Sequence, residues 1–376
     1  MALISTGTFS PEHSSITSPY RIMSIKNAPA NNVFEAVSKV SNISLDTMSV
    51  EDCNYFKDVY GIEFLNATSN QPILYSNWLT HTHNITKAAE IVNKSGQLSS
   101  IPKSTSDDSF DDYVEKVIIQ AIAVNGALQS SGIKGCVLSQ VDPNLANDTD
   151  GIVRYAIAII DAYAAVGIDK NKVIIKIPIS WNAMQAAKRL TAAGVQCLGT
   201  ICHSLEQAVL AAEAGCVAIS PYVDDLTVNM DPASYVRGPL EENYGYQITK
   251  KIHIYYRAYD IKTVICIAAT IGLDVILALS GVDEMTVPVV ALHKMVNNSV
   301  PEGVTVPGLK KTYTKEEAGP RLYFINGDAE TFNKTYESNA VAVQRYNFAL
   351  DTFKLFQAKA KVLVKNALLE YDLVGN

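Results

Sequence analysis

The run V-I-I-K-I-P, from Val173 to Pro178, has the length of a β-strand and carries a single cation, Lys176. Apolar residues occupy both alternating faces of the run, which is typical of a strand covered on both sides in a parallel sheet. Desolvating a lysine costs several kcal/mol unless it is paired or neutral. The residues alone leave two interpretations open: a nucleophilic lysine, or a structural ion pair with a carboxylate such as Asp46.

Similar apolar runs recur along the chain and alternate with longer amphipathic stretches. Eight strand-helix alternations of this kind indicate a parallel (β/α)8 barrel, the TIM barrel fold of the α/β class. The predicted strands are 40–46, 62–68, 135–141, 173–178, 194–202, 216–223, 263–269 and 284–289. The predicted helices include 111–128, 151–166, 183–193, 205–214, 248–259 and 273–279, followed by a long helical region over 329–369.

The chain is predicted to hold one domain. Residues 1–35 are rich in Ser, Thr, Pro and Asn and are expected to form a flexible tail, and residues 36–376 the barrel with its C-terminal helices. Residues 95–112 and 224–246 are expected to be surface loops. Ser204 and Asp274 are predicted helix N-caps.

The composition of the chain limits the classes of partner that it is expected to bind. A net charge of -7 argues against nucleic acid and anionic membranes, which leaves small molecules or proteins. The six cysteines are scattered through apolar runs, and no segment reaches the length of a membrane span, so a cytoplasmic protein is expected. His81 and His83 lack partners at zinc spacing and are interpreted as loop residues, and neither a metal nor an organic cofactor is expected.

Polar residues gather where the predicted strands end, which is the end of a TIM barrel that carries the active site. A neutral lysine there attacks a ketone or aldehyde to form a Schiff base, and the iminium accepts electrons from a neighbouring carbon-carbon bond. Asp46 and Tyr222 are candidates for moving protons, and Gln140 and Thr200 for holding water. Strand hydroxyls and lone glutamines are more often simple hydrogen-bond partners. The polar set is Asp46, Asn70, Gln140, Asp142, Lys176, Thr200, Ser220 and Tyr222.

The chain resembles the transaldolases in several segments, in order. These are V-I-I-K-I-P-I-S-W-N-A-M-Q-A-A-K-R-L, G-V-Q-C-L-G-T-I-C-H-S-L-E-Q-A-V-L-A-A-E-A-G, I-S-P-Y-V, N-A-T-S-N and Y-N-F-A-L-D-T-F-K-L-F. The resemblance implies a class I aldolase fold with Lys176 as the Schiff-base lysine and Asp46 as the acid/base. It implies that Asn70 and Ser220 contact substrate and that Thr200 positions water.

The chain departs from that pattern at several positions. Gln140 in L-S-Q-V-D stands where transaldolases have glutamate, and Tyr222 where they have phenylalanine; both are similar to the fructose-6-phosphate aldolase branch. Asp225 and Ile271 fall where the family has phosphate-binding arginines, and Leu198 replaces an asparagine. Arginines hold phosphates by charge-assisted hydrogen bonds, so weaker sugar-phosphate binding is expected.

These residues lead to one main hypothesis: an aldol or retro-aldol enzyme acting through a lysine iminium on a small carbonyl substrate without phosphate. A transaldolase of the pentose phosphate pathway, transferring a dihydroxyacetone unit between sugar phosphates, is the first alternative. A non-catalytic ligand-binding relative is the second. The resemblance also implies a possible homodimer.

Overall fold

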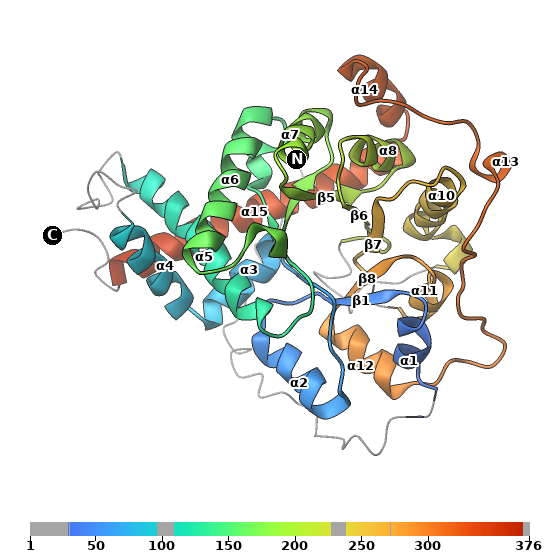
Figure 1. Cartoon of the computed structure of the whole chain (residues 1–376), viewed down its shortest axis with the longest axis horizontal. Helices are drawn as coiled ribbons and strands as arrows, with labels where there is room; N and C mark the ends of the chain where they lie inside the picture. The colour runs from blue at the N-terminus through green and yellow to red at the C-terminus, as the bar shows by residue number, and fades with distance from the viewer. Residues whose placement is uncertain (1–28, 30, 96–108, 227–237, 271, 371–376) are drawn as a thin grey trace, which may run out of the picture.

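The chain forms a closed barrel of eight parallel strands joined in sequence order (Figure 1). The computed structural model describes residues 29, 31–95, 109–226, 238–270 and 272–370. The (β/α)8 prediction is confirmed. The strands are β1 (Asn42–Leu45), β2 (Ala67–Thr68), β3 (Val137–Gln140), β4 (Val173–Pro178), β5 (Gln196–Cys202), β6 (Ala218–Pro221), β7 (Val264–Ile267) and β8 (Glu284–Val287).

β4 has the predicted bounds, and every residue in it is buried. In the ladder, Lys176 pairs with Gln140 of β3 on one side and with Leu198 of β5 on the other. Because successive side chains alternate across a strand, Ile174 and Lys176 share a face. Ile174, Leu138, Leu198 and Ala218 form an apolar cluster inside the barrel, which separates the lysine from the other end.

The helices cover the outside of the barrel. Ser204 caps a helix as predicted, by accepting a hydrogen bond from the Gln207 amide, but the Asp274 prediction is wrong. Gly272 precedes that helix, and Asp274 lies in its first turn, where a carboxylate suits the helix dipole. The main helices are α1 (Val33–Ser38), α2 (Val50–Tyr60), α3 (Gln71–Thr80), α4 (His83–Lys94), α5 (Phe110–Ser130), α6 (Thr149–Ala165), α7 (Trp181–Ala192), α8 (Leu205–Glu213), α10 (Tyr244–Ala258), α11 (Leu273–Ala278), α12 (Val289–Asn297), α13 (Lys315–Ala318), α14 (Ala329–Glu337) and α15 (Ala340–Glu370).

The predicted C-terminal helical region is two helices rather than one. The break falls at Ser338 and Asn339, where the Asn339 side chain accepts a hydrogen bond from the Ala342 amide and so caps α15. α15 runs across the barrel and packs on α3, α4 and α5 (Figure 1). Its inward face includes Tyr346 and Phe353, which belong to an apolar cluster with Tyr222.

The 1–35 tail and the 95–112 loop fall largely outside the described residues, and of the 224–246 loop residues 227–237 do. At their described margins, α1 begins at Val33, α5 at Phe110 and α10 at Tyr244. The loop expected around His81 and His83 is short, because His81 ends α3 and His83 begins α4.

Candidate active site

Lys176 lies at the centre of the barrel, six per cent exposed, towards the carboxyl end of β4. Its Nζ donates to Thr68 Oγ1 at 2.9 Å and to the carbonyl oxygen of Ser69 at 2.7 Å, both at the end of β2. Burial lowers the pKa of Lys176 from 10.5 to about 8, against the opposing effect of the Asp46 carboxylate. A larger fraction of the amine is therefore neutral near physiological pH than for an ordinary lysine, and only the neutral form is a nucleophile.

Asp46 follows β1 and lines the same cavity as Lys176. No ion pair within 4.0 Å joins the two side chains, so among the residues described the structural ion-pair interpretation finds no direct contact. Burial raises the pKa of Asp46, and the nearby Lys176 charge opposes that rise. A carboxyl group with a raised pKa is suited to exchange protons near neutral pH.

Two small cavities meet at Lys176. The first, of about 20 Å³, is lined by Asp46, Asn70, Lys176, Leu198, Ser220 and Tyr222, among others. The second, of about 10 Å³, is lined by Gln140, Lys176, Thr200 and Tyr222, with Asn70 and Phe353 beside them. Each has room for about one water molecule, whereas ligand pockets measure roughly 300 Å³ or more. A ligand larger than a water molecule therefore requires the lining side chains to move.

The second cavity has polar groups suited to a single water. Gln140 Oε1 accepts from Ser69 Oγ at 2.6 Å, while Gln140 Nε2 is buried and has no partner. Thr200 Oγ1 and Tyr222 OH lie 3.2 Å apart. Burial raises the pKa of Tyr222, so its phenol stays protonated at neutral pH. A water bridging these groups satisfies the unpaired amide.

The remaining predicted site residues divide into three groups. Asn70, Ser220 and Leu198 line the first cavity, and the Asn70 side-chain oxygen also caps α3 by accepting from the Ile73 amide. Asp225 does not line either cavity. Ile271 lies outside the described residues.

Asp225 faces a cation instead. Arg345 of α15 approaches it, with 4.0 Å between Arg345 Nε and Asp225 Oδ2, and the guanidinium lies 5.2 Å from the Tyr244 ring centroid. Arg345 Nη1 is buried without a partner. His203, beside Tyr222 at 5.6 Å between ring centroids, has a pKa lowered to about 3 by burial and by Arg345, so it is neutral. The pair Asp225 and Arg345 has no net charge.

Sequence reasoning missed several groups around the amine. Thr68 and Ser69 bind Lys176 directly, and Cys266 and Thr286 line the first cavity. A signal was available for Thr68 and Ser69, which lie at and next to the end of the predicted strand 62–68, whereas Cys266 and Thr286 lie inside the predicted strands 263–269 and 284–289. Arg345 had no such signal, because its place depends on how a distant helix crosses the barrel.

A backbone irregularity lies beside Thr200. Ile201 has φ 57°, an uncommon value for a β-branched residue, and the β5–β6 register shifts between Gly199 and Cys202. Ala269, which lines the first cavity, has φ 56°. Bulges redirect side chains and occur next to active sites. This one lies where Thr200 turns towards the cavity and the following His203 towards Tyr222.

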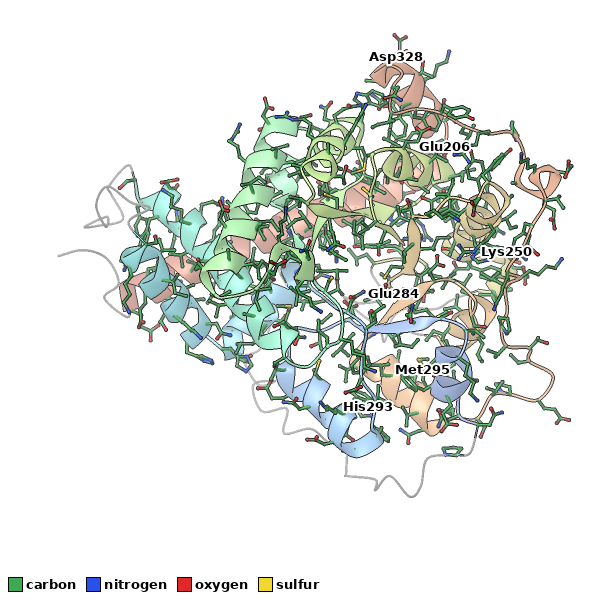
Figure 2. The ribbon with its side chains drawn as sticks, in the orientation of Figure 1. Glu206, Lys250, Glu284, His293, Met295 and Asp328 are labelled. Carbon is green, nitrogen blue, oxygen red and sulfur yellow. The ribbon has the colours of Figure 1, made fainter. Side chains whose placement is uncertain are left out.

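A larger hollow, of about 580 Å³, lies at the opposite end of the barrel and is lined by Asn42, Leu65 and Lys134, which precede or begin strands. Nearby, the buried Glu284 accepts hydrogen bonds from Ser44 Oγ and from Asn66 Nδ2 (2.8 Å), where β8 meets β1 (Figure 2). Barrel enzymes hold their sites at the other end, so this network is interpreted as structural.

Within the described part of the chain, no cluster of His, Cys, Asp and Glu is arranged for a metal ion. None of its helices is both long and apolar enough to cross a membrane. The six cysteines are free thiols, five of them buried.

A TIM barrel with a buried lysine of lowered pKa inside its catalytic end defines the class I aldolase type of enzyme. Comparisons with known proteins agree with this class of enzyme. The chain belongs to the transaldolase/fructose-6-phosphate aldolase family, whose model matches residues 43–362. A transaldolase of Saccharomyces cerevisiae is 26% identical over 88% of this chain and 97% of its own length. The human transaldolase is 31% identical over 66% of this chain and 74% of its own. A Pseudoalteromonas atlantica transaldolase is 26% identical over 89% and 99%.

The lowered pKa of Lys176 predicts the pH dependence of Schiff-base formation. If Lys176 forms the Schiff base, the rate of trapping by cyanoborohydride should rise with pH through an inflection near 8, because only the neutral amine attacks a carbonyl. Asp46→Asn should move this inflection to lower pH, since the Asp46 charge favours the ammonium form. Trapping rates measured between about pH 6 and pH 10 give the inflection. An inflection near 10.5, the ordinary lysine value, would contradict the desolvated site.

Proposed function

We propose that this enzyme transfers a three-carbon ketol unit, as the transaldolases do, through an iminium on Lys176. The observation that carries the proposal is the buried amine with a pKa near 8, held by Thr68 and Ser69 at the catalytic end of the barrel. The names of the relatives support transfer between sugar phosphates as its form. Five buried free thiols fit a reducing compartment such as the cytoplasm.

The proposed reaction begins with the neutral Lys176 Nζ adding to the donor carbonyl. The carbinolamine loses water, and the second cavity, with Gln140, Thr200 and Tyr222, has room to receive it. A base then removes the proton from the hydroxyl next to the breaking carbon-carbon bond. The electrons of that bond flow into the iminium and leave an enamine, and the aldehyde fragment departs. Addition of the enamine to an acceptor aldehyde reverses these steps.

In this proposal Asp46 is the base and Tyr222 a hydrogen-bond donor. Both face the first cavity, and the raised pKa of Asp46 brings its titration closer to neutral pH. The Tyr222 phenol remains protonated and is oriented by Thr200. We place Asn70 and Ser220 on the substrate hydroxyls, because both are polar and line the first cavity.

A second candidate is aldol chemistry on a carbonyl compound without phosphate. It rests on Leu198, which lines the first cavity with an apolar side chain, and on Asp225 and Arg345, which lie outside both cavities and carry opposite charges. A phosphate group carries about two negative charges near neutral pH, and a cation that faces a carboxylate attracts it less strongly.

Assays with phosphorylated and unphosphorylated substrates decide between the two candidate functions. With fructose 6-phosphate as donor and erythrose 4-phosphate as acceptor, transferase activity supports the first proposal. Adducts at Lys176 are detected by borohydride reduction followed by mass spectrometry. If they form only with unphosphorylated ketones or aldehydes, they support the second candidate function. If no carbonyl compound forms an adduct, both are wrong and a non-catalytic ligand-binding relative remains.

The Asp225 carboxylate gives a quantitative prediction. If the substrates are sugar phosphates, Asp225→Asn should raise kcat/KM for them by roughly tenfold, since Arg345 loses its competing carboxylate and repulsion of the phosphate falls. The same variant should change kcat/KM for unphosphorylated analogues by no more than about twofold. Glu206→Gln, a change of the same kind on α8, serves as the control (Figure 2). If Asp225→Asn changed kcat/KM equally for both substrate classes, this carboxylate would have no part in the selection of phosphorylated substrates.

A further inference from the structure

Two parts of the wall of the second cavity come from distant parts of the chain. Val141 and Pro143 form one of them, just after the end of β3, and Phe353 of α15 forms the other. Asp142 lies between Val141 and Pro143 and takes no part in the proposed reaction. A contact that fixes Asp142 therefore also fixes this part of the wall.

The buried Asp142 carboxylate faces a partner with each of its oxygens. Oδ1 accepts hydrogen bonds from the backbone amide and the side chain of Asn144, both at 2.8 Å, at the start of the short helix η3 (Pro143–Leu145). Oδ2 faces the ammonium of Lys361 on α15, at 4.0 Å. The carboxylate thus joins a backbone turn at the cavity to a cation on the C-terminal helix.

Lys361 has a second carboxylate beside it. Its Nζ lies 2.7 Å from Glu115 Oε2 of α5, and we call the contacts of Lys361 with Asp142 and Glu115 the Lys361 bridge. Burial disfavours the ammonium, but the hydrogen bond and charge of Glu115, together with the Asp142 charge, raise the pKa of Lys361 above its ordinary value. The bridge therefore keeps its cation at neutral pH.

Lys361 and Phe353 lie on the same face of α15. They are about two helical turns apart, with the buried Gln357 midway between them. Along this face α15 packs on both α5 and η3. The ammonium at one end of the face thus fixes where the helix presents Phe353 to the second cavity.

We propose that Lys361 is a positioning residue: its bridge holds the Asp142 turn against α15 and keeps the second cavity at the size of about one water molecule. The inference rests on the proposed function, in which the cavity receives the water lost from the carbinolamine. It adds that a cavity of fixed size keeps further water away from the enamine on Lys176.

The enamine has two fates after carbon-carbon cleavage. In transfer, it adds to an acceptor aldehyde. In release, the enamine carbon takes a proton from water, and the resulting iminium adds one water, frees the amine of Lys176 and gives up the three-carbon ketone. Release regains the water that was lost when the iminium formed. A second cavity that widens admits more water and shifts the enamine from transfer towards release.

Lys361→Met tests the bridge in the full-length enzyme, with fructose 6-phosphate as donor and erythrose 4-phosphate as acceptor. The variant leaves the buried Asp142 carboxylate without the cation that faces it, and a buried charge in that state drives the turn to rearrange. The ratio of released dihydroxyacetone to the longer ketose phosphate should rise on the order of tenfold. Lys361→Arg keeps a cation beside both carboxylates and should stay within about twofold of the wild-type ratio.

Lys365→Met is the matched control. Lys365 lies one turn further along α15 and pairs with the exposed Asp111 of α5 at 2.6 Å, away from the second cavity. This control should leave the ratio unchanged, because an exposed pair of this kind contributes little. A ratio that Lys361→Met does not raise, or that Lys365→Met or Lys361→Arg raises as far, overturns the proposal.

Hydrogen exchange tests the bridge without any substrate. The amides of Asn144, Leu145 and Ala146 donate hydrogen bonds within the Asp142 turn, and in Lys361→Met they should exchange on the order of tenfold faster than in the wild type. The amides of β4 should keep their wild-type rates in both lysine variants. Unchanged exchange at the turn overturns the bridge whatever the reaction is. If the wild-type enzyme transfers no unit from fructose 6-phosphate, the transfer function is wrong, and this measurement alone decides on the bridge.

Discussion

Replacing Lys176 by methionine should lower kcat/KM on the order of 10⁴-fold and remove the borohydride-trapped adduct. The amine of Lys176 is the only nucleophile that the proposed reaction uses, and methionine keeps a comparable length of apolar side chain in the barrel. The fold should survive, because the substitution removes a desolvated amine that makes only two hydrogen bonds, to Thr68 and Ser69. Steady-state kinetics and intact-protein mass spectrometry measure the two losses.

Lys188→Met is the matched control for this prediction. Lys188 lies on α7 and is exposed at the surface, where its ammonium bonds the Asn326 side chain. This control should keep full activity and the adduct. A Lys176→Met enzyme that retains activity within tenfold, or that still traps the same substrate, would assign the chemistry to another residue.

The barrel was predictable from the sequence because parallel strands covered on both faces read as apolar runs, and β4 was predicted to the residue. Short strands were harder. β2 has only two residues, Ala67 and Thr68, so the predicted run of seven overstated it. The cap at Gly272 was missed because Asp is a preferred N-cap residue, whereas the helix begins at Leu273 and places Asp274 in its first turn.

The site was predictable only where it coincides with strand ends. Lys176, Asp46, Asn70, Thr200, Ser220 and Tyr222 meet at two cavities because the ends of the strands converge. Arg345 was not predictable in this way, since it comes from a helix more than a hundred residues further along the chain than Asp225. Its approach adds a cation beside the Asp225 carboxylate that comes from another part of the fold.

The electrostatics also separate two proton carriers that the sequence left equivalent. Burial raises the pKa of both Asp46 and Tyr222, but with different consequences. A carboxyl group starts near 4 and rises towards neutral pH, where it can both accept and release a proton. A phenol starts near 10 and moves further away, so it acts only as a hydrogen-bond donor. In the proposed reaction Asp46 is thus the better general base, and Tyr222 orients the substrate oxygen by donating a hydrogen bond to it.

This separation predicts unequal effects. Asp46→Asn should reduce kcat by about 10² to 10⁴-fold and remove the acidic limb of the kcat profile, because the amide cannot accept the hydroxyl proton. Tyr222→Phe should reduce kcat by less, within about 10²-fold, because it removes one hydrogen-bond donor and leaves Thr200 Oγ1 beside the second cavity. The acidic limb of the kcat profile should remain in this variant. Burst kinetics of enamine formation, followed for both variants across pH, measure carbon-carbon cleavage apart from product release.

Thr335→Val on α14 is the control for both variants, because Thr335 is exposed at the surface and lines neither cavity. Its activity should stay within a few-fold of the wild type. The reverse ranking, with Tyr222→Phe the more damaging change and the acidic limb lost with it, would make the phenol the proton carrier. The raised pKa of Tyr222 would then have to fall when substrate binds, since only a phenolate can accept a proton.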